Sequence, residues 1–167
     1  MLVRCLYASR PIEPLSGAFL DSILEQSRKK NPALGITGLL CVSKDLFIQV
    51  IEGGRDEVCD LFNAIVRDDR HQNVRLLAFE EISERQFGNW TMAEVNVSNL
   101  NPAMVLKYFK RSELDPFTCS GKATLALLSD LVATGAALSH RDRDERLCIN
   151  AARLGLSQRR PSSTGCR

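Results

Sequence analysis

Two apolar segments joined by a short polar turn constrain the fold of this chain more than any other feature. Residues 35–42 carry almost no polar side chain, and residues 46–51 are apolar apart from one glutamine. Between them lies Ser43-Lys44-Asp45, a typical turn sequence. Apolar runs of this length bounded by turn residues predict buried strands, and two in succession predict a hairpin. We therefore expect a sheet with this hairpin near its centre.

Strands and helices alternate along the rest of the first hundred residues. Residues 2–9 alternate as a strand does, with Tyr7 on one face and Leu6 on the other. Leu15 to Lys30 and Arg55 to about Arg67 show apolar positions at helical spacing. The first helix has the stripe Leu20, Ile23, Leu24 and Ser27; the second has Val58, Leu61, Phe62, Ile65 and Val66.

Two further strands and two shorter helices complete the predicted elements. The strands are expected at residues 74–82 and 92–97. One helix begins at Pro102 with Asn99 as its cap, and another runs from Ser120 to about Gly135.

The order of these elements predicts an α+β fold. The series β-α-β-β-α-β-β matches the ferredoxin-like split βαβ arrangement, with two further helices after it. Both long helices should cover one face of the sheet. The C-terminal helices should cover the other, because a sheet that is apolar on both faces needs two covering layers. We expect three segments: residues 1–98, a helical extension at 99–138 and a tail at 139–167.

Composition and charge exclude several classes of protein. The 167 residues suit one domain, and the 44% hydrophobic and 25% charged residues exclude wholesale disorder or a fibrous protein. No apolar run reaches the ~20 residues that span a bilayer, and the N-terminus lacks a secretion signal, so we expect a cytoplasmic protein without membrane association. Residues 139–167 contain seven Arg against three acidic residues, a net charge of +4. Such a tail can touch nucleic acid or acidic lipid, but solvated termini are common, and no direct nucleic-acid binding is expected.

The six cysteines do not predict a metal site or a disulfide framework. None forms a CxxC pair, and no histidine lies at ligand spacing. Without a secretion signal, free thiols acting as small apolar side chains are expected. Cys5 and Cys41 lie in strand patterns that favour burial.

Three polar side chains occupy positions that a purely structural interpretation does not explain. Tyr7 and Gln49 lie on the inward faces of two predicted strands, and Asn31 stands between a helix and Pro32. A buried glutamine left without partners costs about 1–3 kcal/mol per unsatisfied group. The first and third strands of this fold are central neighbours, so Tyr7 and Gln49 can meet beneath the two helices. A Tyr–Gln pair that merely satisfies itself in the core remains the alternative.

Several motifs in fixed order carry a family resemblance. They are Leu6-Tyr7-Ala8-Ser9, Asn31-Pro32 followed by Gly35-Ile36-Thr37-Gly38, the run from Phe47 to Gly53, Asp68-Asp69-Arg70-His71, and Trp90-Thr91-Met92. Together they resemble the BLUF family, the blue-light sensors that use flavin. The resemblance extends over about residues 2–97 without an insertion, which makes residues 1–98 the flavin-binding domain.

The resemblance implies a role for each matching residue. Tyr7 would donate an electron and a proton to the excited flavin, and Gln49 would be the switching amide between Tyr7 and the flavin N5/O4 edge. Asn31 would bind the pyrimidine edge, and Ile23 and Ile65 would sandwich the ring. Trp90 and Met92 join Tyr7 and Gln49 as photoactive residues. The full implied FAD-binding set is Tyr7, Ile23, Ser27, Asn31, Phe47, Gln49, Ile65, Asp68, Arg70, His71 and Met92. Without the resemblance, the apolar members are ordinary core residues and 68–71 is a solvated turn.

The implied function is a non-enzymatic photoreceptor. Electron and proton transfer from Tyr7, with rotation or tautomerisation of Gln49, would red-shift the flavin. The last strand would relay the change to the C-terminal helices, which would contact a downstream signalling protein. The partner's identity stays open, as does a homo-oligomer of two or more copies.

Two alternatives belong to other classes. One is a light-insensitive ferredoxin-like interaction module, and the other is a small acylphosphatase-like enzyme. The second needs an anion-binding loop, and residues 10–14 offer Arg10 but no glycine-rich cradle. A visible spectrum separates both from a flavin sensor.

Overall fold

A five-stranded mixed sheet forms the centre of the molecule. The structure, a computed structural model, describes residues 1–43, 45–89 and 91–134. Trp90 and the predicted tail at 139–167 lie outside the described residues. The elements are β1 (Leu2–Pro11), α1 (Gly17–Lys30), β2 (Thr37–Ser43), β3 (Leu46–Gly54), α2 (Arg55–Val66), β4 (His71–Ile82), β5 (Ala93–Asn96), α3 (Pro102–Leu106) and α4 (Gly121–Ala133).

The strand order confirms the predicted topology. It is β4-β1-β3-β2-β5, with β2 and β5 parallel and the other neighbouring pairs antiparallel. β1 and β3 are therefore adjacent and central. In their register Tyr7 lies directly opposite Gln49.

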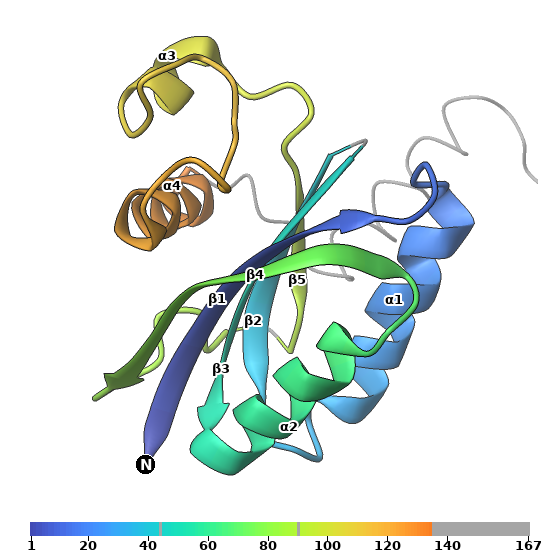
Figure 1. The fold of residues 1–167 in the computed structure, drawn as a ribbon. Helices are drawn as coiled ribbons and strands as arrows, with labels where there is room; N and C mark the ends of the chain where they lie inside the picture. Colours follow the sequence, from blue (N-terminus) through green and yellow to red (C-terminus); the bar gives the residue numbers. More distant parts are fainter. Residues whose placement is uncertain (44, 90, 135–167) are drawn as a thin grey trace, which may run out of the picture.

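The helices cover the two faces of the sheet as the pattern predicts. Figure 1 shows α1 and α2 together on one face and α3 and α4 on the other side. The α1/α2 side has a core that includes Cys5, Phe47 and Leu24. The opposite side has a larger core that joins strand residues such as Leu6 and Ile48 to Leu128 of α4. Each central strand thus contributes alternate side chains to two separate cores.

Local capping chemistry sets where the helices begin. Ser16 and Ser120 accept hydrogen bonds from the backbone N–H groups of Phe19 and Ala123 and so cap α1 and α4. The prediction that Asn99 caps α3 was wrong. Asn101 is the cap, because it directly precedes Pro102 and its side-chain oxygen accepts from the N–H of Ala103 at 2.9 Å.

The apolar stripe of α2 is less buried than predicted. Val58 is fully buried, but Val66 is 50% exposed, so its assignment to the buried stripe was wrong. At 3.6 residues per turn Val66 lies roughly 80° around the helix from Val58, whereas Ile65 lies only about 20° away. Leu61 and Ile65 are half-buried, and both line a cavity between the two helices.

The cysteines in the described part of the chain are free thiols, as the sequence analysis expects. Cys5, Cys41, Cys59 and Cys119 are free, and the first two are buried. Burial raises the pKa of both buried thiols, which keeps them protonated and poorly nucleophilic. Among residues 1–43, 45–89 and 91–134, no helix has the length and apolarity to cross a bilayer.

A glycine in the central hairpin provides a test of this packing. A Cβ on Gly38 would lie 2.2 Å from the Val50 carbonyl oxygen, whereas one on Gly17 would meet nothing within 4 Å. Gly38→Ala should therefore lower the free energy of unfolding by about 1–3 kcal/mol, the usual cost of overpacking. Gly17→Ala, the control at the start of α1, should leave it unchanged or raise it slightly. Urea unfolding measures both; equal stabilities for the two variants would contradict the close approach of β2 and β3.

Candidate flavin site between the two helices

A buried tyrosine and a buried glutamine form the floor of the candidate site. Tyr7 is 1% exposed and Gln49 is 5% exposed. The Tyr7 hydroxyl donates a hydrogen bond to Gln49 Oε1 across the central strand pair. Burial, with smaller contributions from Cys5 and Asp68, raises the pKa of Tyr7 far above its usual value. Tyr7 is therefore a neutral phenol and a hydrogen-bond donor near neutral pH.

Met92 extends this contact toward the fifth strand. The Gln49 amide nitrogen lies 3.2 Å from Met92 Sδ and donates to it. Met92 is 2% exposed and directly precedes β5. Gln49 thus joins Tyr7 on β1 to the segment that leads into β5. Trp90, the other predicted relay residue, lies outside the described residues.

A cavity of about 140 Å³ opens above Tyr7 and Gln49 between α1 and α2. Its wall combines apolar side chains from both helices with polar side chains from the sheet and the turns. Every residue of the predicted FAD-binding set except Met92 lines it: Tyr7, Ile23, Ser27, Asn31, Phe47, Gln49, Ile65, Asp68, Arg70 and His71. Met92 contacts Gln49 instead. The fold therefore brings together residues that the sequence separates by up to 64 positions.

Asn31 presents an amide to this cavity from the end of α1. It is the C-cap residue of that helix and is 2% exposed. Its amide nitrogen donates to the Thr91 carbonyl oxygen at 2.9 Å, next to Met92. Since an amide offers two N–H donors and an acceptor oxygen, Asn31 retains hydrogen-bonding capacity for a ligand.

The turn after α2 forms a charged end of the cavity. Asp68 accepts hydrogen bonds from the Arg70 backbone N–H at 2.9 Å and from its guanidinium at 2.5–3.0 Å. Those hydrogen bonds lower the pKa of Asp68 to about 2. Arg70 also donates to Gln26 of α1 at 2.9 Å, so it bridges the two helices at this end.

His71 is the first residue of β4, which begins three residues earlier than the predicted strand at 74–82. Its Nδ1 lies 2.8 Å from the Ser9 hydroxyl, and its ring centroid lies 5.0 Å from that of Phe47. Burial is the largest cause of a lowered pKa, so His71 is neutral near pH 7.

Several lining residues were missed by the sequence analysis. They are Gln26, Lys30, Leu34, Leu40, Leu61 and Ala64. Gln26 and Lys30 follow Ile23 by three and seven positions, so they share its side of α1. The helical spacing that placed Ile23 and Ser27 on one face therefore also places Gln26 and Lys30 there.

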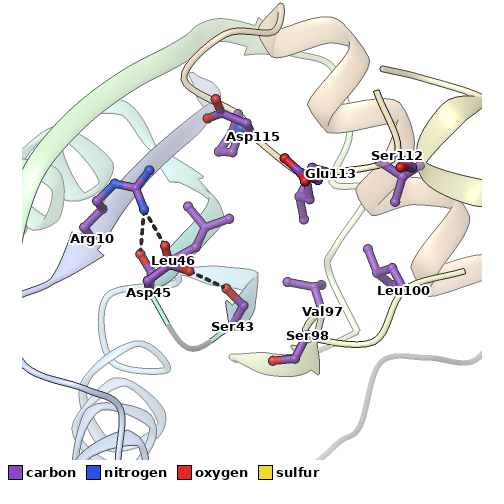
Figure 2. Close-up of a pocket in the computed structure, with 13 residues that line it drawn as sticks. Arg10, Ser43, Asp45, Leu46, Val97, Ser98, Leu100, Ser112, Glu113 and Asp115 are labelled. Carbon is purple, nitrogen blue, oxygen red and sulfur yellow. Dashed lines mark hydrogen bonds and ion pairs between the residues drawn. The ribbon is translucent and has the colours of Figure 1, made fainter. Parts of the chain in front are cut away.

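A second cavity, of about 450 Å³, lies elsewhere on the sheet (Figure 2). Its wall includes Arg10 and Asp45 on one side and Leu100, Glu113 and Asp115 on the other. None of the predicted flavin residues lines it. The Arg10 guanidinium, which the enzyme alternative needs free for an anion, donates to the Asp45 carboxylate at 2.7 Å and lies 5.0 Å from the Phe117 ring centroid.

Comparison with known proteins identifies the family. Residues 2–93 match BLUF, described as sensors of blue-light using FAD. This chain belongs to the BLUF family. It is accordingly a flavin-binding blue-light sensor domain, and the predicted resemblance and α+β ferredoxin-like fold are confirmed.

Solved structures of short BLUF proteins are similar over most of this chain. BlsA in its photo-activated state is 30% identical with a TM-score of 0.70, covering 78% of this chain and 94% of BlsA. BlrB in the dark state is 32% identical with a TM-score of 0.64, covering 80% of this chain and 96% of BlrB.

Longer relatives share only this region. The photoactivated adenylate cyclase subunit alpha of Euglena gracilis is 30% identical over 108 residues, which are 64% of this chain and 11% of the cyclase. The blue light- and temperature-regulated antirepressor BluF of Escherichia coli (strain K12) is 29% identical over 90 residues, 53% of this chain and 22% of that protein. The chain thus spans about a tenth of the cyclase and a fifth of the antirepressor.

The side chains around the cavity fit a flavin. The isoalloxazine ring is a flat apolar body with amide-like groups at its edges, and the cavity offers aliphatic walls with two buried carboxamides. One Gln49 amide hydrogen is directed to Met92, and no acceptor for the second is present among the described residues. Lys30 provides a cation suited to a phosphate, whereas the Arg70 guanidinium is already bound to Asp68 and Gln26.

The Asp68–Arg70 contact generates a pH-dependent prediction. Because the folded-state pKa of Asp68 lies near 2, below its ordinary value of 3.8, the unfolded carboxyl binds a proton first as the pH falls. The stabilisation is complete above about pH 4 and is lost toward pH 2. Asp68→Asn should therefore lower the free energy of unfolding by about 1–2 kcal/mol at pH 6, with the difference shrinking as the pH approaches 2.

Urea unfolding across that pH range, with flavin at constant excess, measures the effect. Asp69→Asn is the matched control, because Asp69 is exposed and does not line the cavity. A difference between parent and Asp68→Asn that stays constant with pH would refute the assignment.

Proposed function

We propose that light acts on this protein by rearranging the hydrogen bonds of the Tyr7–Gln49 pair. The observation that carries the proposal is the hydrogen bond from the Tyr7 hydroxyl to Gln49 at the floor of the inter-helix cavity. Membership of the family implies a bound flavin and light sensitivity. The hydrogen bond supports Tyr7 and Gln49 as the two side chains that respond.

Different residues around the cavity would hold different parts of FAD. Ile23 of α1 and Ile65 of α2 would pack on the two faces of the ring, and Asn31 would bind its pyrimidine edge. Ser27 and Phe47 complete the pocket around the ring. Asp68, Arg70 and His71 would contact the ribityl and phosphate end, and Lys30 adds a cation there.

The photochemical step is an electron and proton transfer that starts at Tyr7. A bound flavin would supply the absorption of blue light and the redox chemistry. Tyr7 would give it one electron and the hydroxyl proton, which can leave along the hydrogen bond to Gln49 Oε1. The raised pKa of Tyr7 means that the proton is present before illumination. Neither buried cysteine is needed as a nucleophile, because burial raises the pKa of both thiols and keeps them protonated.

The signalling state differs from the dark state in the amide of Gln49. When the electron and proton return to Tyr7, the Gln49 side chain is left rotated or tautomerised. In this altered state Gln49 would offer a different hydrogen bond to a bound flavin, and the red shift would report that difference. The same change alters the contact between Gln49 and Met92, which directly precedes β5.

The output is a change in protein contact and involves no catalysis by this chain. Residues 1–98 form the flavin-binding domain, 99–138 the helical extension and 139–167 a basic tail. A light-driven shift in the packing of α3 and α4 would alter binding to a downstream signalling protein or to a second copy of the chain. The description of the Escherichia coli relative as an antirepressor supports a protein partner as the target.

Tyr7→Phe tests the photochemical step. The variant keeps the ring that fills the core and removes the hydroxyl that donates to Gln49 Oε1. It should bind flavin yet lose the reversible red shift completely, as measured by light-minus-dark absorption spectra. Tyr108→Phe is the matched control because the sequence contains two tyrosines, and Tyr108 donates to Asp130 of α4.

Two results would overturn this proposal. A Tyr7→Phe variant with a normal photocycle would remove Tyr7 as the donor. A parent protein that stays colourless after reconstitution with FAD would favour the light-insensitive interaction module.

A further inference from the structure

A buried carboxylate lies on the sheet face opposite the flavin cavity. Glu52 of β3 is 0% exposed. It follows Gln49 by three positions, so its side chain extends to the α4 side of the sheet while that of Gln49 faces α1 and α2. Arg4, its direct partner on β1, donates to Glu52 Oε1 at 2.7 Å. A buried ion pair of this kind needs further hydrogen bonds to offset its desolvation.

The connection between β4 and β5 supplies those hydrogen bonds. The backbone N–H groups of Gln86 and Phe87 donate to the two Glu52 carboxylate oxygens at 3.3 and 2.9 Å. The Arg85 guanidinium donates to the Glu52 carbonyl oxygen at 2.7 Å. Three consecutive residues of the connection are therefore bound to one residue of β3.

The same connection is bound to β3 again at its other end. Met92 Sδ accepts a hydrogen bond from Gln49, three positions before Glu52. Residues 85–87 and Met92 thus contact the central strand at two points roughly 10 Å apart along it, on opposite faces of the sheet. A change in the Gln49–Met92 contact would therefore act on one attachment of the connection, while Glu52 ties its other end to the same strand.

Residues 86 and 87 also contact the C-terminal helix. The Phe87 ring is fully buried in the core that contains Leu127, Leu128 and Leu131 of α4. The Gln86 side chain donates to the Ser129 hydroxyl of α4 at 2.8 Å. The Arg4 guanidinium lies 5.9 Å from the Phe87 ring centroid, so the ion pair holds that ring in place as well.

We propose that Glu52 is a positioning residue that couples the Gln49 switch to α4 through residues 85–87. Because Glu52 ties residues 85–87 to β3, a movement of Met92 strains the connection between its two attachments and changes how Gln86 and Phe87 pack against α4. This inference rests on the proposed function, because it requires Gln49 to change on illumination. It adds a route to α4 besides the direct one through β5.

The test compares light-induced changes in α4 among matched variants. Glu52→Gln keeps the side-chain shape but loses the charge that binds Arg4. Gln86→Ala leaves Glu52 intact and removes only the exposed contact with Ser129. Glu80→Gln is the control, since Glu80 also binds Arg4, at 3.0 Å, but its side chain is 48% exposed, and it is Glu52 that accepts from the backbone of residues 86 and 87.

Two readouts are recorded for each flavin-loaded variant: the reversible red shift, and hydrogen exchange of residues 121–133 in the dark and in the light. In Glu52→Gln and Gln86→Ala we expect the full red shift with a light-induced exchange change in α4 several-fold smaller than in the parent. Glu80→Gln should match the parent in both. A purely structural role for Glu52 would raise dark exchange throughout the sheet and leave the light response of α4 intact.

The outcomes separate this inference from the proposed function. A full α4 response in folded Glu52→Gln or in Gln86→Ala overturns the coupling through residues 85–87, with the red shift still supporting the Tyr7–Gln49 switch. If Glu52→Gln does not fold, the light-induced exchange change of α4 in Gln86→Ala alone tests the coupling. A parent protein without a red shift overturns the proposed function and this inference together.

Discussion

The hydrogen bond between Tyr7 and Gln49 is the interaction around which the site is organised. It exists because β1 and β3 are antiparallel neighbours with these two residues in direct register. The Tyr7–Gln49 hydrogen bond leaves part of the glutamine amide without a partner in the pair, because the amide has more donors and acceptors than one phenol can bind. The remaining capacity faces Met92 and the cavity between the helices. The pair is consequently able to respond both to a ligand above it and to the chain beside it.

The two-sided sheet explains how a small change at this pair can affect distant residues. Alternate residues of β3 enter different cores, so Gln49 lies beneath the flavin cavity while Glu52 lies under residues 85–87 and α4. A strand is stiff along its length, and both ends of the β4–β5 connection are bound to this one. The fold therefore provides two discrete attachment points, and we propose that their relative position governs how that connection packs against α4.

Sequence reasoning predicted the parts that depend on periodicity. The alternation in residues 2–9 and 46–51 placed Tyr7 and Gln49 on one face, and strand adjacency brought them together. The helical stripe in α1 placed Ile23 toward the cavity, while the role of that cavity came from the family resemblance. Helix ends were less predictable, as the shift of the α3 cap from Asn99 to Asn101 shows, because capping depends on where the chain first turns.

The Glu52 network could not be predicted from the sequence. A glutamate at the end of a strand is ordinarily exposed, and two of its hydrogen-bond donors here are backbone N–H groups more than thirty positions away. Because almost every residue has a backbone N–H group, the amino-acid sequence does not identify Gln86 and Phe87 as partners of Glu52. The prediction for Val66 was wrong for a simpler reason. Its side chain is apolar, but its position on α2 is turned away from the sheet and leaves it 50% exposed.

An experimental structure of the dark, flavin-loaded protein tests the central claim most directly. The account predicts the isoalloxazine ring between Ile23 and Ile65, with one polar edge toward Gln49 and the other toward Asn31. A flavin bound in the cavity beside Arg10 and Glu113, or a Tyr7–Gln49 pair with no ring above it, would contradict the account.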